Sequence, residues 1–152
     1  RYRGRSYKLL IRKNGLSERV SLQHGNLTVF TASQKRNTHV GDLLNVWYSD
    51  KAHRLFSERL SACFPLFAYD EVPGLMVKRM TRRWGSYSFK THRVILNQDL
   101  IKAPAMHIDY VIIHELCHLT HRRHSRAFYY LLASKLPQWE KLKTELELRL
   151  LG

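Results

Sequence analysis

A histidine–glutamate motif is the part of this sequence with the clearest capacity for chemistry. The run His114-Glu115-Leu116-Cys117-His118 places two histidines four residues apart, with glutamate after the first. Residues at this spacing share one face of an α-helix, so both imidazole rings can bind one metal ion. Glu115 is turned by about 100° from His114 and can hold a water molecule at that ion. The motif is the HExxH pattern of zinc peptidases, with two zinc ligands and a general base.

The residues around the motif predict that its helix is buried. Apolar side chains occupy one face at Ile108, Ile112, Leu116 and Leu119, and Val111, Ile113 and Cys117 cover most of the remainder. A helix that is apolar nearly all round belongs in a core. Burial of imidazole and carboxyl groups there costs free energy unless the groups act together. The alternative is a buried polar cluster that is satisfied by hydrogen bonds alone.

Catalytic zinc needs a third protein ligand, and the sequence offers two. His124 follows His114 by ten residues. This is the metzincin spacing, except that His121 replaces the usual glycine. We expect His121 at the rim, because a helix continuing to it would place it about 10 Å along the axis from His114. A turn near residue 121 brings His124 back to the ion, and we favour it over the rival ligand, Glu140.

Peptide hydrolysis by one zinc ion assigns further roles. Zinc polarises the scissile carbonyl group, and Glu115 takes a proton from water and passes it to the leaving amine. A donor is also needed for the oxyanion of the tetrahedral intermediate. The candidates for this role or for the rim are His121, Arg122, Tyr129 and Tyr130, and the candidates for the cleft wall are Arg83 and Trp84.

The rest of the sequence predicts one α+β domain over residues 1–152. The order is strands and a long helix over 1–74, then strands and helices over a catalytic core at 75–152. The expected strands span 7–11, 19–22, 27–31, 75–80, 84–89 and 93–96, and the expected helices span 38–62, 105–121, 125–135 and 138–151. Thr38 and Ser125 are the expected N-caps, and His24-Gly25-Asn26 is the expected hairpin turn.

Composition restricts the class of protein. The chain has 44% hydrophobic residues and lacks the run of about 20 apolar residues that a membrane helix needs. Its two cysteines, Cys63 and Cys117, are too few for a disulfide scaffold, which favours the cytoplasm. The net charge of +14 indicates attraction to an anionic partner such as nucleic acid. We expect a monomer that acts on a peptide or protein.

Three segments in order resemble the YgjP-like metallopeptidases, a family of small zincin-like proteins. They read MTRRWGSYS at 80–88, VILNQDLIKAP at 94–104 and IDYVIIHELCHLTHRRHSRAF at 108–128. The resemblance implies a zincin fold, with a small mixed or antiparallel sheet on the active-site helix and a substrate groove along an edge strand. It also supports His124 as the third ligand. Tyr87 and Arg123 replace the family's usual cysteine and asparagine, which puts substrate choice in doubt.

Two alternatives to a simple peptidase are open. SprT-like proteases, a related HExxH group, act on DNA-bound proteins, and the basic clusters at 1–13, 78–93 and 122–126 suggest a nucleic-acid-associated protein. Its zinc site would be structural, or its substrates would be bound to DNA. A structural site usually has four protein ligands that include cysteine, so the motif favours catalysis. The other alternative is a catalytically idle zincin that serves as a scaffold.

Overall fold

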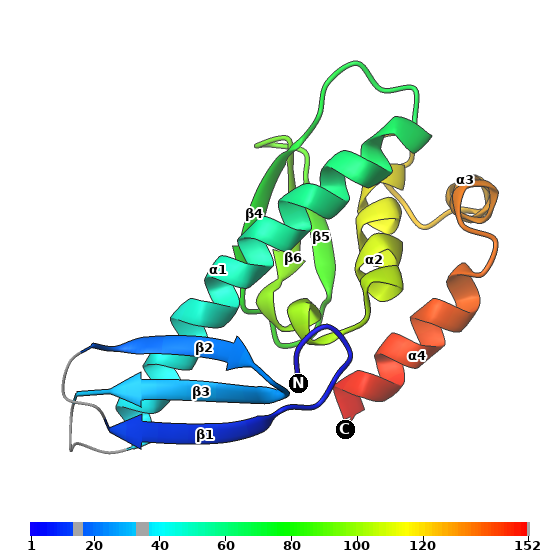
Figure 1. Ribbon diagram of the computed structural model, residues 1–152. Helices are drawn as coiled ribbons and strands as arrows, with labels where there is room; N and C mark the ends of the chain where they lie inside the picture. The colour runs from blue at the N-terminus through cyan, green and yellow to red at the C-terminus, as the bar shows by residue number, and fades with distance from the viewer. Residues whose placement is uncertain (14–16, 33–36, 152) are drawn as a thin grey trace.

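The structure is a computed structural model that describes residues 1–13, 17–32 and 37–151. It is an α+β fold with two three-stranded sheets and four α-helices in the described chain (Figure 1). The elements are β1 (Lys8–Lys13), β2 (Arg19–Gln23), β3 (Asn26–Thr31), α1 (Asn37–Cys63), β4 (Gly74–Lys78), β5 (Gly85–Ser88), β6 (Arg93–Asn97), α2 (Ala105–Cys117), α3 (Arg126–Lys135) and α4 (Trp139–Leu151). The α+β prediction is confirmed. The side chain of Thr38, the expected N-cap of α1, lies outside the described part.

The N-terminal sheet has the strand order β1-β3-β2 and packs on α1. Strand β1 is parallel to β3, and β2 is antiparallel to it. The expected hairpin joins β2 to β3, because His24 and Gly25 both have positive φ, at 48° and 76°. Two such residues make a turn whose twist matches that of the strands. Leu27 and Val29 are buried on the face that α1 covers, while the opposite face of the sheet is open.

The second sheet positions the candidate site. Its order is β4-β6-β5, so β5 is an edge strand. Strand β6 pairs antiparallel with β5 and parallel with β4. Asn97, at the end of β6, donates from Nδ2 to the carbonyl oxygens of Met80 (2.7 Å) and Arg83 (2.9 Å). This buried amide therefore fixes the path of the chain that leads into β5.

Helix α2 lies at the centre of the fold and contacts α1, α3, α4, β5 and β6 (Figure 1). Ile108, Ile112 and Leu116 are fully buried, as the apolar pattern predicts, and Cys63 and Cys117 are buried packing residues without a disulfide. Arg59 of α1 binds Asp109 of α2 through two contacts of 2.6 Å. Nε2 of the buried His107 contacts the carboxylate of Glu145 at 2.6 Å. These two pairs hold α1 and α4 against α2.

The end of α2 differs from the sequence prediction. The expected helix over 105–121 ends at Cys117, and the amides of residues 118–120 bond to the third residue back. Tyr69 stabilises this early end, because its hydroxyl donates to the carbonyl of Leu116 (3.1 Å) and lies 2.7 Å from Oγ1 of Thr120. A side chain can satisfy a helix-end carbonyl in this way. Ser125 then caps α3 by accepting from the amide of Phe128 at 3.3 Å, as expected.

None of the described helices combines the length and the apolar character that a membrane span requires.

Candidate metal centre

Three imidazole rings meet at the C-terminal end of α2. His114 lies in its last turn, His118 is the residue that ends it, and His124 precedes α3. One ring nitrogen from each lies within 4.8 Å of those of the other two. Nε2 of His114 and Nε2 of His124 are 3.0 Å apart. Glu140, the rival third ligand, is not a member of this cluster.

The chemistry of the three histidines fits a metal ion. His118 donates from Nδ1 to the carbonyl oxygen of His121 at 3.0 Å, which leaves Nε2 unprotonated toward the cluster. Burial, together with the neighbouring His118 and His124, lowers the pKa of His114 to about 3. Burial also lowers the pKa of His124. Neutral imidazole is the form that binds metal, and three such ligands match a catalytic zinc site.

Glu115 lies beside this cluster and is almost completely buried. Its carboxylate Oε2 is 3.9 Å from Nε2 of His118. Burial raises the pKa of Glu115 to about 8, and the positive charge of Arg83 partly opposes this effect. A carboxyl group with a pKa close to neutral exchanges protons readily under physiological conditions. The site therefore combines a buried carboxyl group with three imidazole rings that could hold a metal ion.

Gly85 brings the edge strand β5 into direct contact with α2. A Cβ atom at this position would lie 2.7 Å from Cγ1 of Val111 and 3.0 Å from Oε1 of Glu115. Real Cβ atoms essentially never approach another atom as closely as 2.7 Å, so a side chain at residue 85 would force Val111 or the strand to shift. Trp84-Gly85 could form either a bend that packs the sheet on α2 or an ordinary hairpin. The close approach favours packing on the helix, and Trp84 itself is half-buried at the cleft.

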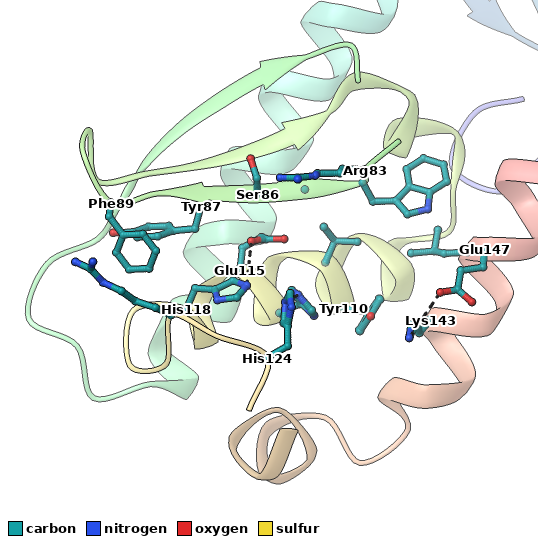
Figure 2. A pocket seen from close by; sticks show the side chains of 16 residues that line it. Arg83, Ser86, Tyr87, Phe89, Tyr110, Glu115, His118, His124, Lys143 and Glu147 are labelled. Atoms are coloured by element: carbon teal, nitrogen blue, oxygen red, sulfur yellow. Dashed lines mark hydrogen bonds and ion pairs between the residues drawn. The ribbon is translucent and has the colours of Figure 1, made fainter. Parts of the chain in front are cut away.

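A cleft of about 520 Å³ lies between β5, α2 and α4, with the histidines along one side. Figure 2 shows Arg83 and Ser86 on the side opposite the histidines, Tyr87 and Phe89 at one end, and Lys143 and Glu147 at the other. Of the ten rim, oxyanion, cleft and site residues proposed from the sequence, those that line it are Arg83, Trp84, His114, Glu115, His118, Arg122 and His124. The remaining three, His121, Tyr129 and Tyr130, are not among its lining residues.

The three absent candidates have other surroundings. The side chain of Tyr130 is directed to solvent, with 77% of its surface exposed. Tyr129 stacks on Trp139 with ring centroids 5.1 Å apart. His121 contributes its backbone carbonyl to His118. These contacts explain why proximity to the motif in sequence did not bring these three residues into the cleft.

Sequence reasoning also missed residues that do line the cleft. Tyr110 is one of them, and its ring centroid lies 6.0 Å from that of His114. Burial raises the pKa of its hydroxyl above the usual value, so this group keeps its proton. The signal was available, because residue 110 precedes His114 by four residues on the same helix face. Lys143 and Glu147 of α4 gave no such signal, since only the tertiary fold brings them to the cleft.

Comparison with known proteins places this geometry in context. The sequence profile of the YgjP-like metallopeptidase domain matches residues 1–149. The fold is similar to the metallopeptidase zymogen abylysin of Pyrococcus abyssi, with a TM-score of 0.57 and 17% identity over 62% of this chain and 93% of that one. It is also similar to the zymogen jannalysin of Methanocaldococcus jannaschii, with a TM-score of 0.51 and 21% identity over 65% and 96% of the chains. The sequence comparison with curated proteins gave no significant match.

Proposed function

This chain belongs to the YgjP-like metallopeptidase family, and we propose that it hydrolyses peptide bonds with one zinc ion bound by His114, His118 and His124. The single observation that carries the proposal is the convergence of three imidazole nitrogens within 4.8 Å, directly beside the buried Glu115. Three nitrogen ligands leave a coordination position open for water or substrate, as catalysis requires.

The side chains of the cleft supply the remaining chemistry. Zinc, when bound, is a Lewis acid that polarises the scissile carbonyl group and makes water nucleophilic near neutral pH. The carboxylate of Glu115 accepts a proton from the attacking water and delivers it to the nitrogen of the leaving amine. Tyr110 lines the same cleft one helical turn before His114, and its protonated hydroxyl is the proposed donor to the oxyanion. The carbonyl of His121 holds the ring of His118 in a metal-binding orientation.

Metal content per chain tests the ligand assignment. Protein purified without a histidine tag or chelator should contain one zinc ion in the wild type and in Glu140→Ala, and none in His124→Ala. Zinc that is retained in His124→Ala and lost in Glu140→Ala would transfer the third-ligand role to Glu140. The absence of zinc from the wild type, even after zinc is added back, would remove the basis for a zinc peptidase.

Hydrolysis of a peptide mixture, followed by mass spectrometry, tests the general base. Glu115→Gln should keep the metal and lose hydrolysis, because the amide cannot accept the proton. Glu147→Gln is the matched control, since it removes a carboxylate at the far end of the cleft from the histidines (Figure 2). Full activity in Glu115→Gln would assign the base elsewhere.

A second candidate function, association with nucleic acid, is favoured by the open face of the N-terminal sheet. Arg12 and Arg19 flank Phe30 on adjacent strands, and the guanidinium of Arg19 lies 4.5 Å from the centroid of the Phe30 ring. Lys8 lies on the same face of β1, and no carboxylate belongs to this face of the three strands. Cations around an aromatic ring suit the phosphates and bases of a single strand.

Fluorescence anisotropy with a single-stranded DNA oligonucleotide tests this second function. Arg12→Gln and Arg19→Gln should each weaken binding and reduce the slope of log affinity against log salt by about 0.7 for each phosphate that the variant no longer binds. The matched control is Arg54→Gln, which removes the same charge from an exposed position of α1. Equal binding by all three variants would leave no specific role for the sheet face.

A further inference from the structure

We propose that the cleft selects peptides that carry carboxylate groups beside the scissile bond, with Arg83 and Arg122 as the residues that determine this specificity. The inference rests on the proposed peptidase function and names its substrate class. Two observations carry it: the balance of charges on the cleft walls, and the position of one free guanidinium group near each end of β5.

The cleft has an excess of unpaired positive charge. Its lining includes three cations, Arg83, Arg122 and Lys143, and two carboxylates, Glu115 and Glu147. Lys143 and Glu147 form an ion pair at 3.7 Å and so largely cancel. Among the described residues, neither Arg83 nor Arg122 takes part in an ion pair. Both are exposed at the cleft, and a bound zinc ion would add further positive charge.

Arg83 is held where the chain enters β5. Its backbone carbonyl accepts from the side-chain Nδ2 of Asn97 at 2.9 Å. The backbone carbonyl of Trp84, the next residue, accepts from the backbone N–H of Asn97 at 2.8 Å. In Figure 2 its side chain extends along β5 toward Ser86, on the wall that faces Glu115. The backbone is therefore fixed while the guanidinium group stays available to a ligand.

Arg122 is held at the opposite end of the same strand. Its guanidinium carbon lies 4.4 Å from the centroid of the Phe89 ring, directly after β5. Phe89 in turn packs edge-to-face on Tyr87, with centroids 4.8 Å apart. Stacking on an aromatic ring restricts the motion of arginine without using its hydrogen-bond donors. Arg122 can thus bind a carboxylate at little additional cost in side-chain entropy.

The chemistry of arginine favours carboxylates as the recognised groups. Guanidinium is charged at every physiological pH and binds a carboxylate through two parallel hydrogen bonds. A cleft whose walls carry one sign of charge also concentrates ligands of the opposite sign. An extended peptide that passes the zinc site along β5 meets Arg83 on one side of the reacting bond and Arg122 on the other. Acidic side chains on either side of that bond are therefore the matching substrate feature.

The test compares two internally quenched peptide pools with the zinc-loaded full chain. One pool carries Asp and Glu beside the central bond, and the other carries the neutral isosteres Asn and Gln. The acidic pool should be cleaved with a kcat/KM at least about tenfold higher, and the double variant R83Q/R122Q should lose that preference. The matched control R82Q/R123Q removes the same charge from the adjacent positions, which do not line the cleft. This control should keep the preference for the acidic pool. Pools with amidated C-termini separate side-chain carboxylates from the terminal carboxylate.

A binding measurement keeps the inference distinguishable from the proposed function. Fluorescence anisotropy of the labelled pools on zinc-loaded Glu115→Gln requires no hydrolysis, and the acidic pool should bind about tenfold more tightly. Equal binding of both pools, or a preference that survives in R83Q/R122Q, overturns the inference even when peptides are cleaved. Hydrolysis of neither pool, with acidic binding intact, overturns the proposed peptidase function alone.

Discussion

Gly85 and Glu115 approach each other so closely that a Cβ atom at residue 85 would press on the carboxyl group of Glu115. A Cβ atom at Gly85 would lie 3.0 Å from Oε1 and 3.2 Å from Cγ of Glu115. The edge strand of the second sheet therefore rests directly on the carboxyl group that the proposed mechanism uses as its base. The contact also explains why the RWGS element occurs together with HExxH: the first supplies the surface against which the second is packed.

Gly85→Ala should therefore damage both stability and catalysis. Overpacking at this contact is expected to lower the free energy of unfolding by about 1–3 kcal/mol. The displaced Glu115 should lower kcat, while zinc content stays at the wild-type value because no histidine is touched. Urea denaturation and peptide turnover measure the two effects. Gly41→Ala is the matched control, because a Cβ atom at that position in α1 meets nothing within 4 Å. Wild-type stability and turnover in Gly85→Ala would show that β5 can move away without consequence.

The three histidines that meet in the structure could be grouped from the sequence because the signals are local. The spacing of four residues between His114 and His118 follows from helix geometry, and the ten-residue spacing to His124 is the metzincin pattern. The end of α2 at Cys117 was missed, because Tyr69 comes from a distant loop to bind the helix end. Lys143 and Glu147 of α4 were missed for a similar reason, because only the tertiary fold brings them to the cleft.

The strands and helices were predicted more completely than the way in which they pair and pack. All the predicted strands and helices exist, since alternation and helical spacing are properties of short segments. The parallel pairings of β1 with β3 and of β4 with β6 join segments distant in sequence, and no local pattern encodes them. The side of the cleft formed by α4 depends on the contact of His107 with Glu145. That pair lies 38 residues apart and has no sequence signature.

Glu115→Gln should stabilise the metal-free protein at neutral pH. The pKa of Glu115 is raised from 4.5 to about 8, so folding favours its protonated form. The resulting loss in the free energy of unfolding is absent below pH 4.5. It grows as Glu115 ionises in the unfolded chain, and it levels off above pH 8. At pH 7 the corresponding penalty is about 3 kcal/mol, which the neutral amide avoids. Urea denaturation in the presence of a chelator, from pH 4.5 to 8, measures the difference between variant and wild type.

The control for this experiment is Glu147→Gln, because the side chain of Glu147 is 59% exposed. Its stability should follow that of the wild type at every pH. If the difference in free energy of unfolding between Glu115→Gln and the wild type does not widen with rising pH, the burial of an ionisable group at residue 115 is contradicted.

The pair of Arg59 and Asp109 should contribute more to stability than other ion pairs of the chain. Two contacts of 2.6 Å join α1 to α2, and the side chains of Arg59 and Asp109 are 34% and 22% exposed. A double-mutant cycle with Arg59→Met and Asp109→Asn is expected to give a coupling energy of about 1–2 kcal/mol. The same cycle on Lys102 and Asp99, a more exposed pair, should give less than about 1 kcal/mol. Equal coupling energies would mean that the bidentate geometry adds nothing.

Zinc should raise the melting temperature of the wild type, and replacement of His121 and of His124 should have different effects on this shift. At free zinc about 100-fold above Kd, binding to the folded state alone adds about 2.7 kcal/mol of stability. For a chain of this length that corresponds to a rise of roughly 5–10 °C.

His124→Ala should abolish the shift, because it removes a proposed ligand. His121→Ala should preserve it, because His121 reaches the site only through its backbone carbonyl, which alanine retains. Differential scanning calorimetry with and without zinc, with magnesium as the control ion, gives both numbers. Loss of the shift in His121→Ala with retention in His124→Ala would exchange the roles of the two residues.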